Sequence, residues 1–555
     1  MSTSVTATRP RPMRLLVAAL VAVCALVTGW AWAVASPLGS SPDEEYHLAS
    51  IWCPPPVESS GCEVSRDAQQ RLTVDVPEAI APDAICWRNN LDASAGCANG
   101  MSEEVLAPSW RVDQGQYPGG MYKVLHLLVG EDVHASVLAA RMAGGVLAVL
   151  LGIAVVAVGD RSVRRQLACM VLGAYVPMGV YLVASVNPSG WSLLGVSTVF
   201  LAMQSLLRAV GRRHVVASAA LVAVGVLVAL CARGDAGPMV AVAAVASALI
   251  GVDRVRRRPL LLLAPLAVCA AGAYALVGSL QVTNAQQAGA AEGVSTVGRT
   301  AQRVFLDNLA DLPGLVTGAY GSSQLGQLDA PLPSLVHVPA LLAAGGICLA
   351  GMRQLSLGKV AAIGMTLAAV CAIPMYMLQT SLLRVGEVVQ PRYVLPLLPV
   401  LVGCCVAPTG SRVLSLTRGQ ALAVWGAVTV AHATALLFLF RRFATGLDGA
   451  MLPRTKIEWQ WPGAPVPATS WLLGSLAFAV AALALVLVST GQADEPTYDR
   501  RAVGAGSGGT VTTPGVPATE RRTLTPSPSR AVEQESSEER GRSASRPGRP
   551  KRREV

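Results

Sequence analysis

Charged residues are scarce in this chain, because Asp, Glu, Lys and Arg together make up only 14% of its 555 residues. Hydrophobic residues make up 52%, which is too much apolar sequence for a single soluble core. They gather in uninterrupted runs of about 18 to 23 residues, the length that crosses a hydrocarbon core of about 30 Å. We therefore expect an all-α, polytopic membrane protein, and a soluble globular fold is excluded.

Aromatic residues are also few, at 5%, and no basic patch interleaved with aromatic residues occurs outside the apolar runs. The formal net charge of +10 would otherwise suggest a nucleic-acid partner. The basic residues instead stand in short segments between apolar runs and in the C-terminal tail, which is the pattern of the positive-inside rule. Nucleic-acid binding is thus excluded, and membrane lipids are the expected surroundings.

Residues 1–13 are expected in the cytoplasm, followed by a first transmembrane helix over residues 14–36. A cleaved signal peptide is the competing interpretation, since Ala33-Val34-Ala35 resembles a signal-peptidase site. The apolar run has about 20 residues, whereas the hydrophobic region of a signal peptide has about 7 to 15. It also contains tryptophans, which suit a membrane interface. An uncleaved helix is therefore favoured.

Residues 37–132 form an expected extracytoplasmic loop, in which acidic residues outnumber basic ones. The loop contains four cysteines: Cys53, Cys62, Cys86 and Cys97. No Cys-x-x-Cys spacing occurs among them, which disfavours a zinc site. An even set of cysteines in a polar loop outside the cytoplasm predicts two disulfides, with the pairing left open.

The remaining apolar runs fill residues 133–488, an expected multi-helix membrane domain with outside loops near 281–334 and 441–470. Arginine-rich segments alternate with the outside loops, and Asp253 to Arg258 is the strongest of them. The pattern predicts about twelve transmembrane helices with both termini in the cytoplasm. Residues 489–555 are rich in Gly, Pro, Ser, Thr and Arg, which predicts a disordered cytoplasmic tail.

An acidic stretch, Ser41 to His47, follows the first apolar run directly. It is typical of a helix start, with Ser41 as N-cap, Pro42 at the first helical position and Glu44 closing a capping box. In such a helix Asp43 and His47 lie four residues apart on one face. The stretch is either a structural helix cap alone or a cap that also presents Asp43 for chemistry.

Several segments outside the apolar runs carry a resemblance to a known family. In chain order they are Pro42-Asp43-Glu44 with His47, Tyr117-Pro118 through Leu128, Gly326 through Pro333, and Gln390-Pro391-Arg392-Tyr393 through Pro396. Over roughly residues 14 to 490 the chain resembles the bacterial membrane proteins grouped as domain of unknown function 2142. That family looks like a branch of the GT-C superfamily, whose polytopic glycosyltransferases take sugars from polyprenyl-phosphate carriers.

The resemblance implies a GT-C-like fold in the bacterial plasma membrane and an inverting glycosyltransferase activity. It further implies a polyprenyl-phosphate sugar donor, an envelope glycan acceptor, and a catalytic acid from the first outside loop. The matching positions in this chain are Asp43 and Glu44.

An inverting glycosyl transfer needs a carboxylate to accept the proton of the acceptor hydroxyl and a cation to stabilise the departing lipid phosphate. Asp43 is the expected base, and Glu44 is a supporting acid or metal ligand. Arg392, followed by Tyr393, is the expected phosphate-binding residue, because guanidinium matches phosphate oxygens; an anchor at the membrane interface is the alternative. The sequence specifies no cofactor, and a divalent metal ion on Asp43 and Glu44 is left open.

Three further polar residues are candidate substrate contacts, each with a structural alternative. His47 is more typical of a hydrogen-bonded interface histidine than of a base. Asp329 is also explained as the cap of a turn between prolines. Arg141 lies inside the second apolar run, where a charge is costly in lipid, so it should face the protein interior as a pairing or substrate group.

The enzyme hypothesis predicts that Asp43, Glu44 and Arg392 converge on one cavity at the outer membrane face. A secondary transporter or flippase of envelope precursors is the main alternative, although such folds usually show two matching halves and no repeated half is apparent. A non-catalytic membrane scaffold is the third hypothesis. Replacement of Asp43 separates them, because an enzyme would lose activity while it kept its fold.

Overall fold

The structure is a computed structural model of the chain, and it describes residues 11–88, 90–277, 295–410, 413–452 and 457–490. The described part is mostly helical, as predicted. The expected cytoplasmic N-terminus and the expected disordered tail fall almost wholly outside the described residues.

Eight helices of the described chain are long and apolar enough to cross a membrane. They are α1 (Arg11–Ala33), α4 (Val133–Val158), α8 (Arg212–Ala232), α11 (Leu263–Val277, preceded by the turn η5, Pro259–Leu262), α15 (Ser334–Gly351), α16 (Leu357–Ser381), α18 (Arg418–Ala444) and α19 (Pro467–Thr490). The other expected runs fall on α5 (Arg161–Ala174) with α6 (Met178–Val183), α7 (Pro188–Leu206), α9 (Ala236–Ile250) and α17 (Leu397–Val406). The chain is therefore a multi-pass helical membrane protein, and the count of about twelve spans stays a prediction.

Small residues let neighbouring helices approach closely. A Cβ atom on Gly237 of α9 would lie 2.2 Å from the carbonyl oxygen of Gly272 in α11. A Cβ atom on Gly195 of α7 would lie 2.6 Å from the carbonyl oxygen of Gly225 in α8. Larger side chains would push these helices apart, so the glycines determine how tightly the membrane bundle packs.

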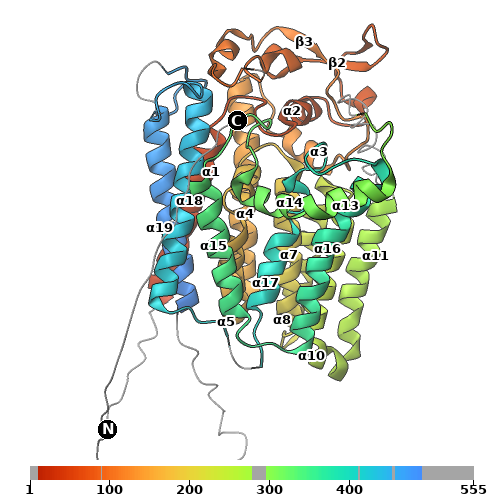
Figure 1. Cartoon of the computed structure of the whole chain (residues 1–555), viewed down its shortest axis with the longest axis vertical. Coiled ribbons are helices and arrows are strands. Elements are labelled where there is room, and N and C mark those ends of the chain that lie inside the picture. Colours follow the sequence, from red (N-terminus) through yellow and green to blue (C-terminus); the bar gives the residue numbers. More distant parts are fainter. Residues whose placement is uncertain (1–10, 89, 278–294, 411–412, 453–456, 491–555) are drawn as a thin grey trace, which may run out of the picture. The chain divides into compact units, whose positions relative to one another are not determined.

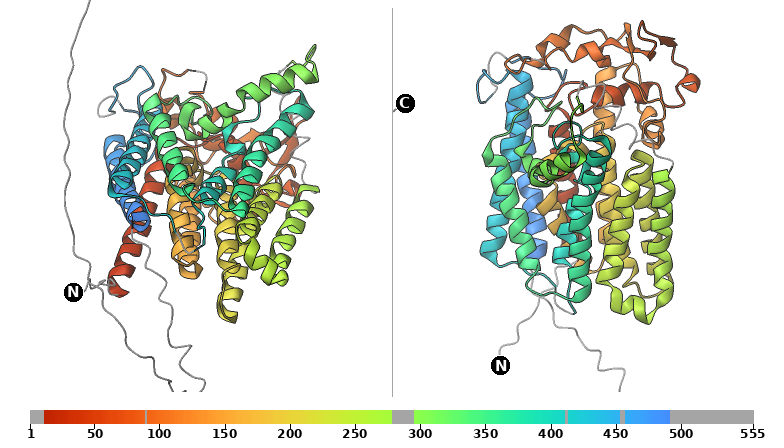
Figure 2. Two further views of the ribbon diagram at one scale, coloured as in Figure 1. Left: turned by 60° about the horizontal axis from the view of Figure 1, so that its bottom comes forward. Right: turned by 45° about the vertical axis from the view of Figure 1, so that its right-hand side comes forward.

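The first loop folds over one end of the helix bundle, which we call the loop end (Figure 1, Figure 2). It holds α2 (Glu44–Trp52), α3 (Gly120–His126), the turns η1 (Val57–Ser59), η2 (Glu78–Ile80), η3 (Pro82–Ala84) and η4 (Ala95–Gly100), and the strands β1 (Val64–Arg66), β2 (Leu72–Pro77) and β3 (Leu106–Ser109). The strands form an antiparallel sheet with β2 in the centre, where Val74 pairs with Val64 and Ser109. The sequence analysis did not predict this sheet, whose short strands show no long alternation of apolar and polar residues.

Two disulfides cross-link the first loop, as predicted. Cys53 is bonded to Cys62, and Cys86 is bonded to Cys97, with sequence separations of 9 and 11 residues. Each cysteine therefore pairs with the next one along the chain, which resolves the pairing that the spacing left open.

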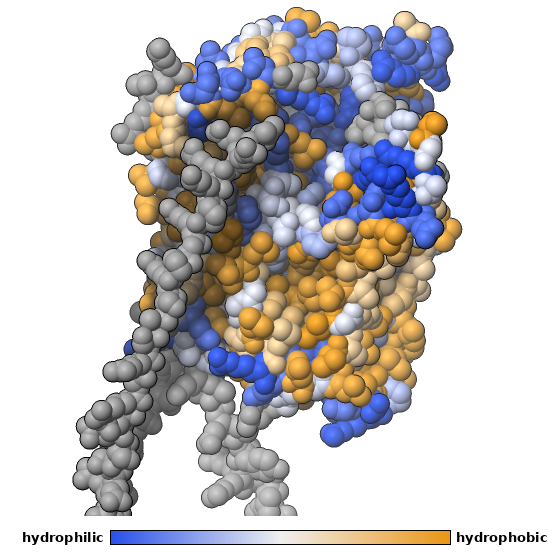
Figure 3. Space-filling view, in the orientation of Figure 1, coloured by the Kyte–Doolittle hydropathy of each residue, from blue (hydrophilic) through white to orange (hydrophobic). Residues whose placement is uncertain are grey.

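The two ends of the bundle differ in composition. The loop end also carries α13 (Ala301–Asp311), α14 (Pro313–Thr317), η6 (Gly318–Ser322) and η7 (Pro391–Tyr393), whereas the opposite end carries α10 (Val252–Arg257) with three arginines in its last turn. On the face drawn in Figure 3, hydrophobic residues form a belt between hydrophilic residues at both ends. This distribution is the one that a bilayer-spanning bundle requires.

The acidic stretch forms a helix start that differs from the predicted one. Helix α2 begins at Glu44, and Asp43 is the N-cap residue, with φ 58° and ψ 20° in the left-handed region. The Glu44 carboxylate accepts the Ser41 N–H at 3.2 Å, as in a capping box, but the buried Ser41 hydroxyl finds no partner among the described residues. The prediction of Ser41 as N-cap and Pro42 as first helical residue is therefore wrong. Asp43 takes the cap position, and its carboxylate is held by arginines instead of by the helix.

Candidate functional site

Asp43 and Arg392 meet at the loop end, although 349 residues separate them in the sequence. Arg392 Nη2 donates to Asp43 Oδ2 at 2.6 Å, and Arg111 Nη2 donates to Asp43 Oδ1 at 3.0 Å. The Asp43 side chain makes no capping hydrogen bond to α2, so both of its oxygens are available to the arginines. The predicted proximity of Asp43 and Arg392 agrees with this contact, whereas a cavity shared by the two stays a prediction.

The two arginines determine the protonation state of Asp43. Burial alone would raise the pKa of the carboxyl group, but the charges of Arg392 and Arg111 outweigh it and hold the pKa well below its usual range. The side chain of Asp43 nevertheless remains 40% exposed. Asp43 is thus an ionised carboxylate that solvent or a ligand can reach.

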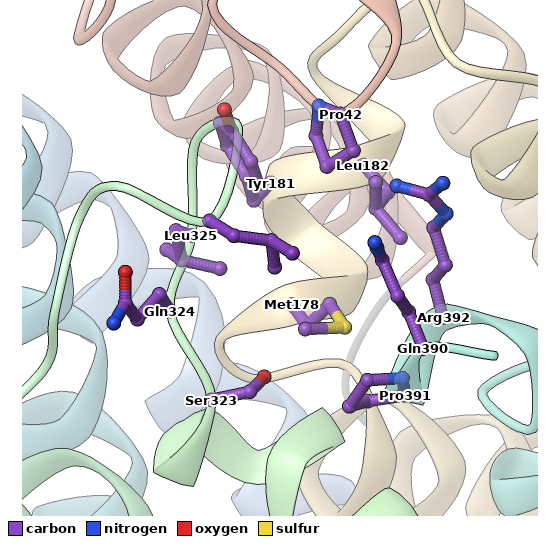
Figure 4. Close-up of a pocket in the computed structure, with 11 residues that line it drawn as sticks. Pro42, Met178, Tyr181, Leu182, Ser323, Gln324, Leu325, Gln390, Pro391 and Arg392 are labelled. Atoms are coloured by element: carbon purple, nitrogen blue, oxygen red, sulfur yellow. The ribbon is translucent and has the colours of Figure 1, made fainter. Parts of the chain in front are cut away.

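Arg392 has a hydrogen-bond donor that is not used by the described residues. Its side chain is 9% exposed, and its buried Nη1 has no hydrogen-bond partner among the described residues. Figure 4 shows Arg392 on the same turn as Gln390 and Pro391, with its guanidinium group beside Pro42 and Leu182. The pocket that these residues line has a cavity volume of about 10 Å³, which is room for about one water molecule.

A further arginine lies next to this pair. Arg233, in the turn between α8 and α9, donates to both carboxylate oxygens of Asp235 at 2.8 and 2.6 Å and to the Ser189 hydroxyl at 3.0 Å. The guanidinium carbons of Arg233 and Arg392 lie 4.8 and 5.7 Å from the centre of the Tyr393 ring. Tyr393 therefore joins two cations in one group.

We call Arg111, Arg233 and Arg392 the arginine cluster. Arg233 and Arg111 are also paired with Asp235 and Glu45, so the capacity to bind an anion such as phosphate rests on Arg392, whose Nη1 has no hydrogen-bond partner among the described residues. The sequence analysis missed two of these residues, because Arg233 resembled the tip of a hairpin and Arg111 stands between strand β3 and a turn without any motif. A signal for Arg111 did exist, since basic residues are few in the acidic first loop.

His47 lies in an aromatic group behind the cluster. Its Nδ1 is 2.8 Å from the Tyr122 hydroxyl, and its ring packs edge-on against Tyr46 and Tyr117. Burial lowers the pKa of His47 to about 3, and the neighbouring Asp43 carboxylate only partly opposes this effect. His47 is therefore neutral near pH 7, and its geometry suits the orientation of Tyr122.

Glu44 is placed differently from Asp43. It is completely buried and forms a bidentate ion pair with Arg141, whose Nε and Nη2 donate to its carboxylate at 2.9 and 2.5 Å. The N–H groups of Ser41 and Val186 also donate to Glu44. The expectation that Glu44 would line one cavity with Asp43 and Arg392 is therefore wrong, because Arg141 and backbone N–H groups occupy its oxygens.

Arg141 faces the protein interior and is 1% exposed. Besides Glu44 it binds the backbone oxygens of Ala33, Ser36 and Pro37, where the chain leaves α1. It therefore connects α4 to the end of α1 and orients the acidic stretch.

Asp329 binds none of the three arginines of the cluster and forms another buried ion pair. It binds Arg442 of α18 at 3.0 Å, and it also accepts the Gln327 N–H within its own turn. Arg442 donates further to the backbone oxygens of Trp87 and Ala93 in the first loop. Burial raises the pKa of Asp329, against the opposing charge of Arg442. This pair therefore connects α18 to the first loop and to the turn that contains Gln327.

Glu45 completes the site and was not predicted from the sequence. Its Oε1 accepts from Arg111 at 2.9 Å, and its Oε2 accepts from Gln327 Nε2 at 2.6 Å. Burial raises the pKa of Glu45, and the charge of Arg111 opposes that rise. Glu45 thus holds Arg111 in position beside Asp43 and links it to the loop that contains Gln327.

The residues proposed for a metal ion do not fit one. Within the described ranges there is no group of three or more His, Cys, Asp or Glu side chains arranged to hold a metal. Each oxygen of Asp43 already accepts from an arginine, and Glu44 is saturated by its own partners. The arrangement therefore disfavours a divalent cation on Asp43 and Glu44.

Comparison with known proteins adds the family. No curated protein matches this chain. A family model described as predicted membrane protein (DUF2142) matches residues 26–401, a segment that includes Asp43 and the arginine cluster but not Arg442. The chain therefore belongs to the DUF2142 family of predicted membrane proteins.

Proposed function

We propose that this protein is an inverting glycosyltransferase of the bacterial cell envelope, with a polyprenyl-phosphate sugar as donor and an envelope glycan as acceptor. The observation that carries the proposal is the 2.6 Å contact between the accessible carboxylate of Asp43 and Arg392, which retains a buried N–H without a partner in the described part of the chain. A base and a phosphate-binding cation thus stand together, as this transfer requires.

The proposal includes an orientation. The disulfide-bonded first loop suits an oxidising compartment, and the arginines of α10 suit the cytoplasm. The loop end would then face outward, with about twelve spans, a GT-C-like arrangement and both termini inside. Helices α5 with α6, α7, α9 and α17 would supply the spans beyond the eight long ones.

In the proposed reaction, the acceptor hydroxyl oxygen attacks the anomeric carbon of the donor sugar. The bond from that carbon to the phosphate oxygen breaks, and polyprenyl phosphate leaves with the electron pair. Asp43 takes the hydroxyl proton, while Arg392 and its cluster neighbours stabilise the departing phosphate.

The Asp43–Arg392 contact gives this mechanism an order of events. In the resting site Asp43 is a weak base, because two arginines lower its pKa. A donor phosphate that binds Arg392 would draw this cation away from Asp43. The pKa of Asp43 would then rise towards its ordinary value, so that the base becomes effective only after the donor is bound.

The donor needs more room than the cavity of about 10 Å³ beside Arg392. The proposal therefore includes a movement of the loop from Ser323 to Leu328, which forms one wall of this pocket, away from Arg392.

Transfer can be measured with purified protein in liposomes and a panel of polyprenyl-phosphate hexoses and pentoses that carry radiolabelled sugar. Wild-type protein should release polyprenyl phosphate and label the acceptor. Asp43→Asn should lower the rate by about 100- to 10,000-fold, whereas the matched control Glu58→Gln, an exposed acid of the same loop, should not.

Other outcomes would favour the alternatives. Movement of the lipid-linked sugar between leaflets without transfer would indicate a flippase. Equal transfer rates for wild type and Asp43→Asn would refute the assignment of Asp43 as base.

A further inference from the structure

Helix α13 runs across the loop end instead of parallel to the long helices (Figure 1, Figure 2). It is fixed to the end of α16 and the turn that follows. Gln379 Nε2 donates to the Ala301 oxygen at 2.9 Å, and the Asn308 side chain donates to the Leu383 oxygen at 2.8 Å and accepts from the Val385 N–H at 2.9 Å. The buried face of α13 is therefore defined by specific contacts.

The sides of α13 flanking that buried face have opposite character. Phe305, Leu306 and Leu309 form an apolar row and are 45%, 57% and 52% exposed. Polar residues occupy the other flank, where Asp307 is paired with Arg384 at 2.8 Å. A helix that exposes three large apolar side chains on one flank and charges on the other suits the boundary between lipid and water.

Exposed tyrosines stand near the same end of two long helices, α16, which contacts α13, and α11. Tyr376 of α16 is 62% exposed and lies three residues before Gln379, which binds the start of α13. Tyr274, near the loop-end terminus of α11, is 86% exposed. Exposed tyrosines gather at membrane interfaces, because the ring is apolar and the hydroxyl is polar. The exposed apolar row of α13 thus belongs to a helix fixed to α16 near the level of its exposed tyrosine.

We propose that α13 is an interfacial helix, with Phe305, Leu306 and Leu309 inserted among the phospholipid acyl chains of the leaflet at the loop end. Lipid is the occupant favoured by the attachment of α13 to the end of the long apolar helix α16 and by the charged groups on the other flank of α13. This inference holds whether or not the protein transfers sugars.

Insertion of α13 would position the arginine cluster relative to the membrane. The chain runs from α13 through α14 into η6, where a Cβ atom on Gly318 would lie 2.4 Å from Pro391 Cγ. The pocket wall that contains Ser323 follows directly. The lipid-facing helix and the turn of Arg392 are thus joined through a tight contact.

A photo-crosslinking experiment tests the inference. The residue p-benzoyl-phenylalanine replaces Phe305 in one variant and Arg303, exposed on the polar flank, in the matched control. Both full-length proteins are placed in nanodiscs of phosphatidylethanolamine and phosphatidylglycerol, irradiated and analysed by mass spectrometry. The probe at position 305 should form lipid adducts about fivefold or more above the probe at position 303.

Two results would overturn the proposal. One is an equal yield of lipid adducts at both positions. The other is a predominant crosslink from position 305 to protein, which would make the row a contact between copies or with another chain. Retention of both disulfides and a monodisperse elution profile would show that each variant is folded.

Discussion

Asp43 and Glu44 are neighbours in the sequence, yet their carboxylates serve different parts of the molecule. Asp43 is reachable from outside and binds cations on distant segments, whereas Glu44 is completely buried against Arg141. Asp43 stands at the N-cap, outside the helix, whereas Glu44 is the first residue of α2. Two adjacent acids in one motif can therefore have different roles, one accessible to a ligand and the other structural.

The Glu44–Arg141 pair should be important for stability. Glu44→Gln leaves a buried guanidinium group without its counter-charge, which costs about 3 to 5 kcal/mol of unfolding free energy. The double variant Glu44→Gln/Arg141→Met removes both charges and should cost less than the two single variants added together. Thermal unfolding midpoints in detergent measure both effects. Strict additivity would contradict a direct energetic coupling between Glu44 and Arg141.

His47 should make stability depend on pH. Its pKa is about 3 in the folded protein and about 6.5 when unfolded, so between these values only the unfolded state binds the proton. Stability should therefore fall as pH is lowered from about 6.5 towards 3, by up to about 1.4 kcal/mol per pH unit.

Unfolding midpoints at pH 7, 6 and 5 check this prediction. His47→Gln should flatten the dependence, whereas the control His126→Gln, at a half-buried position in α3, should retain it. The same slope in wild type and His47→Gln would show that His47 is not the responsible group.

The site was partly predictable at the level of residues. Asp43 and Arg392 each stand beside a proline at the edge of an apolar run, so topology alone brings them to one end of the bundle. The roles of Arg233 and Glu45 were not predictable, because they depend on how the first loop packs on the helices, and the scarcity of basic residues in that loop marked Arg111 without indicating its partner. Sequence spacing contains no information about such contacts between distant segments.

At the scale of elements, the long helices follow from uninterrupted apolar runs of sufficient length. The short sheet and the start of α2 do not. The strands have three to six residues, and Asp43 adopts the left-handed backbone conformation, which is uncommon for non-glycine residues although Asp tolerates it better than most. Helix α13 was also missed. Its few apolar residues do not form a complete apolar face, and its position depends on contacts with α16.

The disulfides of the first loop give a prediction for this element. Cys53, Cys62, Cys86 and Cys97 should not react with a thiol reagent in intact protein until reductant is added. The variant Cys86→Ser/Cys97→Ser should lose about 2 to 3 kcal/mol of local stability and become sensitive to protease. Ready labelling of all four cysteines without reductant would contradict an oxidised loop.

At the scale of the whole molecule, reporter fusions test the orientation. Fusions at Arg164, Arg257 and Arg501 should report a cytoplasmic location, and a fusion at Gln327 should report an outside one. Arg501 lies outside the described residues, whereas Gln327 lies at the loop end beside Glu45. A cytoplasmic signal at Gln327 would overturn the proposed topology and the span count.

The contacts of Arg442 with the first loop have a consequence for biosynthesis. Arg442 binds the Trp87 oxygen across 355 residues, and Trp461 donates to the Ser36 oxygen across 425 residues. The first part of the chain to be synthesised therefore forms these contacts only after the last helices have been made. At a synthesis rate of about 5 to 20 residues per second, the first loop waits roughly 20 to 70 s for α18. Its disulfides span only 9 and 11 residues and can close within that interval. They would keep the newly made loop compact until the last helices arrive to dock it.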